Sequence, residues 1–171
     1  RSHCFLEGTG ECSMITLKQV VEFLADQDLN YELAGDKTVV VSLPGVNKQF
    51  VNVALTVGDT VFKIESFVAR NPDENHEAVY RWILEQNRKL LVINYCLDHL
   101  GDIYLSGTLP VSTVDLDQID QLLGVMLHTS DNSFNVLLEL GFKSAIEREW
   151  AWRTSNGMDL ANLQAFSHLF E

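Results

Sequence analysis

With 171 residues, 46% of them hydrophobic, the chain has the length of one domain and enough apolar side chains for a core of its own. Asp and Glu outnumber Lys and Arg by 24 to 12, and the formal net charge of −12 argues against binding to nucleic acid, whose phosphates such a surface repels. The densest basic cluster (Arg81, Arg88 and Lys89) alternates with Glu77 and Glu85, which is typical of a solvated helix face.

No apolar stretch approaches the roughly 18 residues that a membrane-spanning helix requires. The chain also lacks a basic segment followed by a secretory apolar run near its first residues. Cys4, Cys12 and Cys96 are odd in number and show no CxxC spacing, which fits a reducing compartment rather than a disulfide framework. We therefore expect a cytoplasmic protein without a membrane segment, and we expect Cys96, in the apolar run 90–97, to be buried.

Residues 1–13 show no hydrophobic periodicity. Two interpretations are open: Met14 is the native initiator and the preceding stretch is left over from expression, or the stretch is a disordered natural extension. Both place the start of the folded domain at Met14.

A helix is predicted first, because Thr16 followed by Gln19 forms a capping box. Apolar residues with helical spacing follow up to about residue 28 (Leu17, Val20, Val21 and Leu24). The pattern then alternates as in strands, and turn residues divide it at Gly35, at Pro44-Gly45 and at Gly58-Asp59. A meander of antiparallel strands is expected over residues 31–34, 38–41, 50–57 and 61–67.

Asn71-Pro72-Asp73 is typical of a helix start, with the Asn as cap and the proline in the first turn. A β-hairpin of residues 90–97 and 103–109 is expected next, and Pro110 ends it. One helix is predicted from about Thr113 and a second from Ser130 or Asp131, with Gly141 suited to a cap or a kink. Helical spacing continues to Arg153, and residues 154–171 form a short amphipathic tail.

The predicted order is therefore α-β-β-β-β-α-β-β-α-α, an α+β fold in which helices pack on an antiparallel sheet. Residues 14–153 form its single domain, between the leader 1–13 and the tail 154–171.

Candidate chemical sites are few. His76-Glu77 begins like a zinc-protease helix, but Tyr80 stands where the second histidine is required. The loop of residues 98–102 brings Asp98, His99 and Asp102 together, and it is interpreted as a hairpin turn in preference to a metal site or a hydrolase centre. A nucleophilic role for Cys96 is disfavoured because apolar surroundings raise a thiol pKa. No catalytic, metal-ligating or cofactor-binding residue is assigned.

Trp150 and Trp152 are two residues apart, so they cannot share one helix face. One hypothesis has both indoles covering the sheet edge. The other has them form a partner or dimer surface, since Trp and Arg are enriched at binding hot spots. The candidate surface comprises residues of this segment and of the amphipathic tail: Trp150, Trp152, Arg153, Leu160, Leu163 and Phe166.

Four blocks carry a family resemblance: HEAVYRW at 76–82, DHLGDIYL at 98–105, LELGF at 138–142 and REWAWR at 148–153. With them, the stretch from Met14 to Arg153 resembles the bacterial YbjN-like family, described as sensory-transduction regulators with a fold like type III secretion chaperones. The resemblance implies a cytosolic α+β protein, often a homodimer. It does not imply an active site, so no catalytic residue is carried over. Such chaperones are small, acidic and dimeric, and they bind extended segments of client proteins.

Three hypotheses follow for the function. The preferred one is a non-enzymatic module, chaperone-like or regulatory, that binds an unidentified protein partner and forms a homodimer. The alternative is a small-molecule sensor with a pocket between meander and helices. The third is a cryptic hydrolase or metal enzyme centred on Asp98, His99 and Asp102.

Overall fold

The computed structural model describes residues 14–170, so the expectations for the leader and for Cys4 and Cys12 lie outside the described residues. A six-stranded, fully antiparallel sheet forms the centre, in the order β1-β2-β3-β4-β6-β5. Its strands are β1 (Asn30–Leu33), β2 (Thr38–Pro44), β3 (Phe50–Val57), β4 (Val61–Ala69), β5 (Ile93–Leu97) and β6 (Ile103–Pro110).

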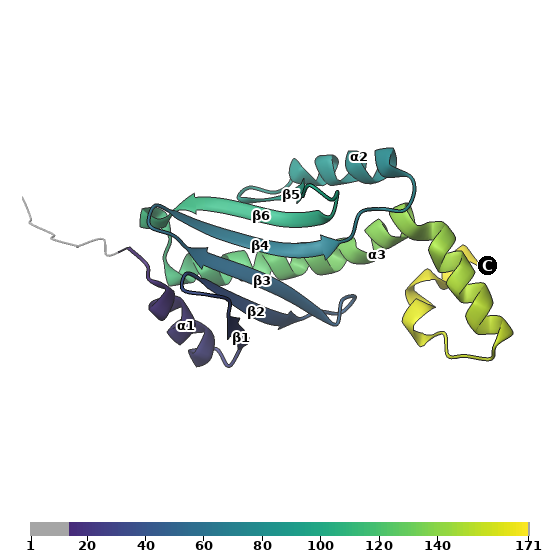
Figure 1. The fold of residues 1–171 in the computed structure, drawn as a ribbon, viewed down its shortest axis with the longest axis horizontal. Helices are drawn as coiled ribbons and strands as arrows, with labels where there is room; N and C mark the ends of the chain where they lie inside the picture. Colours follow the sequence, from purple (N-terminus) through teal and green to yellow (C-terminus); the bar gives the residue numbers. More distant parts are fainter. Residues whose placement is uncertain (1–13, 171) are drawn as a thin grey trace, which may run out of the picture.

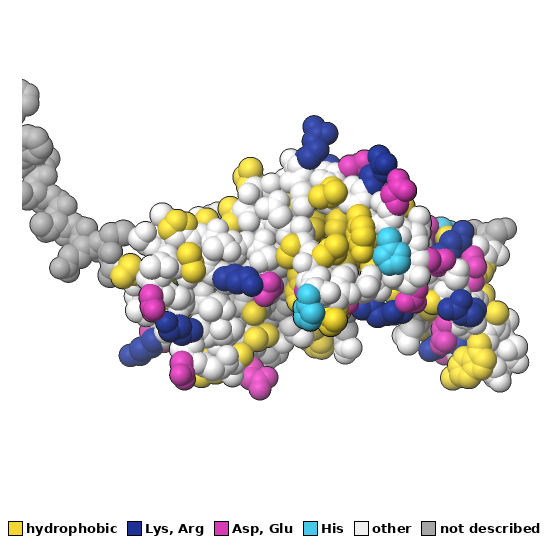
Figure 2. Space-filling view, turned by 45° about the horizontal axis from the view of Figure 1, so that its top comes forward, with side chains coloured by type: hydrophobic (Ala, Val, Ile, Leu, Met, Phe, Trp, Pro, Cys, Tyr) yellow, Lys and Arg dark blue, Asp and Glu magenta, His cyan; other side chains and the backbone are white. Residues whose placement is uncertain are grey.

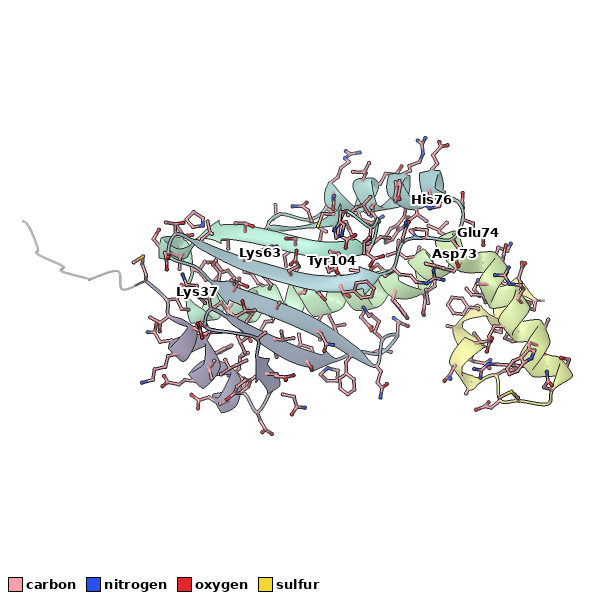
Figure 3. All side chains as sticks on the ribbon, in the orientation of Figure 1. Lys37, Lys63, Asp73, Glu74, His76 and Tyr104 are labelled. Carbon is pink, nitrogen blue, oxygen red and sulfur yellow. The ribbon has the colours of Figure 1, made fainter. Side chains whose placement is uncertain are left out.

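Helices lie on one side of the sheet, and the other side is open (Figure 1). They are α1 (Leu17–Asp26), α2 (His76–Asn87) and α3 (Leu116–Ser155), with short 3-10 segments η1 (Val111–Thr113) and η2 (Ala161–Leu169). Alternate strand residues such as Val53, Ile64 and Leu105 face the helices and are fully buried. The opposite positions carry polar pairs such as Lys63 with Glu65, and Lys63 and Tyr104 mark this face in Figure 3. The α+β fold class and the antiparallel meander are confirmed.

The start of α1 follows the predicted capping box. Thr16 Oγ1 accepts the Gln19 N–H, and the Gln19 side chain accepts the Thr16 N–H at 2.9 Å. Ile15 is buried at the entry to the helix. Local sequence alone fixed this element, because both partners lie within one helical turn.

The predicted start of α2 at Asn71-Pro72 was wrong, since the helix begins at His76 after Asn75. The reason is tertiary: the Asn71 N–H donates to Asp102 Oδ1 at 2.7 Å, and the Asn71 amide donates to the Leu100 carbonyl. Asn71 therefore binds the end of β4 to the β5–β6 loop instead of capping the helix.

The predicted helix break near Ser130 or Asp131 was also wrong. A single helix runs from Leu116 to Ser155, and it kinks at Phe142, whose φ of −141° is non-helical. The Gly141 carbonyl next to the kink accepts the N–H groups of Asp73 and Glu74. Gly141 had been identified as a site for a cap or kink, and the structure confirms the kink.

Beyond the kink, the last third of α3 leaves the sheet, and η2 folds back on it (Figure 1). We call residues 143–170 the C-terminal lobe. Phe166 is buried in it, and Trp150 stacks on Phe170 with ring centroids 4.3 Å apart. The hypothesis that both indoles cover the sheet edge is therefore wrong.

Candidate protein-interaction surfaces

One flank of α2 is exposed and partly apolar. Val79 and Ile83 turn into the core, so the 3.6-residue period leaves another flank on the surface. We call it the α2 outer face, and it consists of Glu77, Tyr80, Arg81, Leu84, Glu85 and Arg88. Leu84 is 64% exposed, and the exposed Cys96, Leu97 and Leu100 of the β5 region add apolar surface. Figure 2 shows the hydrophobic side chains gathered over α2 and β5.

The charges on the α2 outer face alternate along the helix. Glu77 is followed by Arg81, Glu85 and Arg88, with Tyr80 and Leu84 between them. Arg81 contacts Glu77 in an exposed pair at 3.4 Å, which contributes little to stability in water. In the opposite chain direction the order of charges is Arg, Glu, Arg, Glu, so each acidic position of the forward order is matched by a basic one. An antiparallel copy of this helix would therefore meet complementary charges.

The free edge of β5 is blocked at its centre. Both backbone groups of Tyr95 bind the Asn87 side chain at the end of α2: the Tyr95 N–H donates to Asn87 Oδ1 at 2.7 Å, and Asn87 Nδ2 donates to the Tyr95 carbonyl at 3.2 Å. One amide group thus occupies the donor and acceptor that an added strand would use. This protection is a common way to close a sheet edge.

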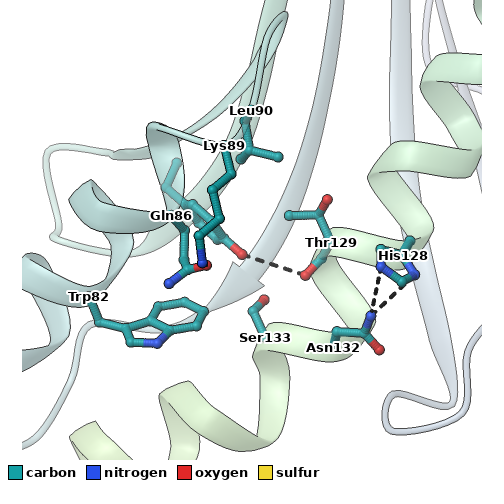
Figure 4. A pocket seen from close by; sticks show the side chains of 9 residues that line it. Trp82, Gln86, Lys89, Leu90, His128, Thr129, Asn132 and Ser133 are labelled. Atoms are coloured by element: carbon teal, nitrogen blue, oxygen red, sulfur yellow. Dashed lines mark hydrogen bonds between the residues drawn. The ribbon is translucent and has the colours of Figure 1, made fainter.

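A groove separates the end of α2 and the start of β5 from the middle of α3, and we call it the α2–α3 groove. It has two adjoining hollows of about 370 and 270 Å³, which share Lys89 and Leu90. Figure 4 shows the first hollow, with Trp82 and Gln86 facing Thr129 and Ser133 across it. Trp82 packs edge-on against Tyr95, with ring centroids 6.0 Å apart.

The α3 wall of the groove is a stripe of residues at helical spacing: Gln118, Gln121, Leu122, Val125, His128, Thr129, Asn132 and Ser133. The Tyr95 hydroxyl reaches the Thr129 carbonyl at 3.5 Å, and burial raises the pKa of this phenol. The Lys89 ammonium donates to the Gln86 amide oxygen, and the His128 ring contacts the Asn132 amide. None of the side chains that line the groove is an Asp or a Glu.

A polar network joins the β2–β3 hairpin to α3. Oδ1 of Asp131 accepts the backbone N–H groups of Val46, Asn47 and Lys48 at 2.8–3.0 Å. Burial acts to raise the pKa of Asp131, but these hydrogen bonds outweigh it and hold the pKa below its ordinary value. The Lys48 ammonium donates to the carbonyls of Phe67 and Val68, and its burial lowers its pKa against the attraction of Asp131. The network is structural, because all these partners are internal.

The carboxylates of the loop 98–102 serve the turn, as predicted. Oδ1 of Asp98 accepts the N–H groups of Leu100 and Asp102, and Gly101 takes a φ of +83°. Oδ1 of Asp102 accepts from Asn71. Within residues 14–170, no group of three or more His, Cys, Asp or Glu side chains is placed to hold a metal ion.

Cys96 was predicted to be buried, and this was wrong. Its side chain is exposed, because strand alternation turns the neighbouring Tyr95 toward the helices and Cys96 away from them. Partial desolvation and the Glu65 carboxylate raise the pKa of the thiol. His76 lies at the exposed start of α2 and packs against Tyr80, with ring centroids 5.9 Å apart.

The predicted partner-surface residues gather in the C-terminal lobe. Trp152 is 52% exposed, whereas Trp150 packs on Phe170 and Phe166 is buried. Arg153 donates to Glu149 at 2.6 Å and to the Asp159 carbonyl. The second bond holds the segment after α3 against the end of that helix. Leu160 and Leu163 are half-buried beside them. Most of these side chains therefore pack within the chain, whereas the indole of Trp152 is exposed.

Sequence reasoning missed the α2–α3 groove and the apolar part of the α2 outer face. Leu84 and Leu91 are 64% and 97% exposed. Charges on both sides of Leu84 were a signal of exposure. No local signal placed Leu91 beside Val125, because the pair is formed only when α3 crosses under the sheet.

No helix within residues 14–170 combines the length and the hydropathy that crossing a membrane requires. An antiparallel sheet with helices on one side, a long last helix and exposed apolar surface at one edge defines the class: an α+β fold like that of type III secretion chaperones.

The comparisons with known proteins agree with this class. The profile of the YbjN family, described as "Putative bacterial sensory transduction regulator", matches residues 16–139, and the chain belongs to this family. An uncharacterized protein of Mycobacterium leprae is 44% identical over 160 residues, which cover 94% of this chain and 87% of the relative. An uncharacterized protein of Mycobacterium tuberculosis is 52% identical over 131 residues, which cover 77% and 72%.

Solved structures share the fold at low identity. YbjN of Escherichia coli superposes with a TM-score of 0.54 at 14% identity, over 72% of this chain and 95% of that chain. The ExsC–ExsE complex matches with a TM-score of 0.52 at 20% identity, over 72% of this chain and 97% of that one. At such identities the likeness shows the fold alone.

Proposed function

We propose that this chain is a non-enzymatic, cytoplasmic protein-binding module with a chaperone-like or regulatory role. The observation that carries the proposal is the exposure of apolar side chains on the α2 outer face and along the α2–α3 groove, where nothing within residues 14–170 covers them. The shared fold with a complex of two proteins, ExsC–ExsE, supports it. The carboxylates of Asp98, Asp102 and Asp131 accept backbone N–H groups and are occupied in holding the fold.

The module works as a homodimer through the α2 outer face. If a two-fold axis crosses α2 between residues 82 and 83, Arg81 of one copy lies against Glu85 of the other, and Glu77 lies against Arg88. Tyr80 then packs against Leu84 of the second copy. This isologous arrangement pairs each charge with its opposite and buries the apolar centre.

A charge-swap series tests the dimer. Arg81→Glu places like charges opposite one another at two symmetric positions, so we expect the dimer dissociation constant in sedimentation equilibrium to rise roughly tenfold or more. Adding Glu85→Arg restores complementarity across the axis, and the double variant should dimerise like the original chain. A monomeric original chain, or a double variant no better than Arg81→Glu, would contradict the arrangement.

Photo-crosslinking in the native cell tests partner binding. A photoreactive residue is placed at Leu84, at Leu91 or at Trp152, one in each candidate surface. We expect Leu84 to give the mass of two copies and Leu91 to give an adduct with another protein. An adduct at Trp152 would support the surface predicted from the sequence. Protein adducts at none of the three positions would refute the protein-binding role.

A small-molecule sensor is the second candidate function. The observation that favours it is the first hollow of the α2–α3 groove, which Trp82 and Tyr95 line. Its volume of about 370 Å³ lies in the range of ligand pockets, and two aromatic rings form one wall. A metabolite bound there should raise the melting temperature with saturation, and Trp82→Ala should abolish the shift. A flat response across a broad metabolite library would remove this candidate.

A further inference from the structure

The α2–α3 groove has the features of a helix-binding site. Its α3 wall runs from Gln118 to Ser133, which at 1.5 Å per residue is a length of about 22 Å, or four helical turns. The second hollow has an apolar floor of Leu90, Ile93 and Leu122, and the Trp82 and Tyr95 rings line the first. Leu91 and Val125 stand at the rim, 97% and 44% exposed. An amphipathic helix of about 15 residues matches this length.

A strand is a poorer occupant than a helix. An extended segment would gain its affinity from backbone hydrogen bonds to a free sheet edge, and the edge nearest the groove is β5. The Asn87 side chain already binds both backbone groups of Tyr95, in the middle of that strand. A helix needs no such edge, because its backbone hydrogen bonds are internal.

The charge of the groove selects among helices. The chain has a formal net charge of −12, yet the groove lining contains Lys89 and His128 and no carboxylate. At physiological ionic strength, charges further away than about 8 Å are largely screened, so the groups in contact decide the preference. Acidic residues on the occupant would pair with Lys89, whereas basic residues at the same place would be repelled by its ammonium group.

We propose that the α2–α3 groove binds an amphipathic helix of a partner protein, with an apolar face of about four turns and acidic residues on the flank next to Lys89. The proposal rests on the protein-binding function and adds the chemistry of the partner. The groove lies on the flank of α2 that carries Trp82 and Gln86, whereas the proposed dimer uses Tyr80 and Leu84. Dimer formation therefore leaves the groove accessible.

Binding of designed peptides to the full chain tests the proposal. The probe is a fluorescein-labelled peptide of about 15 residues, with leucines at helical spacing and glutamates on one flank. A second peptide has lysines in place of the glutamates, and a third has a central proline that breaks the helix. In fluorescence anisotropy at physiological salt, we expect the glutamate peptide to bind roughly tenfold more tightly than the lysine peptide. The proline peptide should bind at least as weakly as the lysine peptide.

Variants of the chain locate the binding site. Lys89→Glu should remove or invert the preference for the glutamate peptide, whereas Lys143→Glu, an exposed control with the same change in charge, should leave it intact. Leu91→Ser should weaken both helical peptides about fivefold without loss of fold, since its side chain is exposed. Equal binding of the charge-matched peptides, tight binding of the proline peptide, or insensitivity to both groove variants would overturn the proposal.

The experiments distinguish failure of the helix-binding proposal from failure of the protein-binding function. If crosslinking at Leu91 yields a partner protein but no helical peptide prefers the groove, the function stands and the helical occupant is refuted. Saturable stabilisation by a metabolite that Trp82→Ala abolishes, with neither peptide binding nor a protein adduct at any of the three crosslinking positions, refutes both in favour of a small ligand.

Discussion

Asp131 joins elements that are distant in the sequence. Its carboxylate holds three consecutive backbone amides of the β2–β3 hairpin, and Asn47 also donates to its carbonyl and to Oδ2. Gly45 is required beside it, because a Cβ at that position would overlap the Asp131 carboxylate and the Lys48 carbonyl. From the sequence, a helix had been predicted to begin at Ser130 or at this Asp, whose chemistry also suits a helix cap. The choice between the two roles depended on a loop more than eighty residues away.

Asp131→Asn should lower the free energy of unfolding by about 2 kcal/mol, because a charged acceptor of several hydrogen bonds is replaced by a neutral one. Urea denaturation followed by far-UV circular dichroism measures the change. Asp120→Asn on the exposed face of α3 is the matched control and should shift stability by less than about 0.5 kcal/mol. Equal effects of the two substitutions would show that the network contributes nothing beyond charge.

The pH dependence of this difference has a defined sign. The folded-state pKa of Asp131 is depressed below its ordinary value of 3.8, so its ionised form stabilises the fold at pH values above 3.8. This contribution is lost as the pH falls through the folded-state pKa. The stability gap between the original chain and Asp131→Asn should therefore be constant from pH 7 to pH 5 and close at lower pH.

At the scale of elements, Gly141 shows why the helix boundaries differ from those expected. A Cβ at this position would lie 2.9 Å from Cβ of Pro72 and 3.3 Å from Cγ2 of Val79. The α2 segment can approach α3 this closely because Gly141 lacks a side chain. Pro72 is thus a packing residue beside the kink, and not the first residue of α2.

Gly141→Ala should destabilise the fold by about 1–3 kcal/mol, because a proline ring and a buried valine must shift to make room. Gly124→Ala is the matched control in the same helix, where an added Cβ meets nothing within 4 Å. It should stabilise the chain by about 0.5–1 kcal/mol through helix propensity. Thermal and urea unfolding of both variants measure whether each substitution raises or lowers the stability. Stabilisation by Gly141→Ala would refute the packing account.

In the whole molecule, the C-terminal lobe lies beyond the kink, and its η2 segment faces the β2–β3 hairpin and the preceding part of α3, where His168 contacts Glu139 at 3.1 Å. The lobe is anchored at its base, where the Glu74 carboxylate accepts the N–H and hydroxyl of Ser144. These contacts lower the pKa of Glu74, and the residue lies next to Asp73 at the junction in Figure 3. The family match ends at residue 139, close to this point. The lobe therefore lies outside the residues that the family profile matches.

Phe166→Ala should loosen the lobe without unfolding the sheet. Phe166 is a buried side chain of η2, and truncating a buried ring costs about 3–5 kcal/mol in a core. Hydrogen–deuterium exchange should show faster exchange in residues 150–169 and unchanged exchange in β2, β3 and β4. Met158→Ala, at an exposed position, should change neither region. Faster exchange throughout the sheet would show one cooperative unit instead.

Features that depend on neighbours along the chain could be predicted from residue patterns alone. The alternation of the strands, the Thr16 capping box and the turn at residues 98–102 all use partners within a few residues, and the resemblance to the YbjN family extended the same information to the fold class. Tertiary structure decided what depends on distant partners: the single kinked helix, the exposure of Cys96, the start of α2 and the groove between Leu91 and Val125. The physical reason is that polar groups such as Asn71 and Asp131 can be satisfied in several ways, and only the packed chain selects one of them.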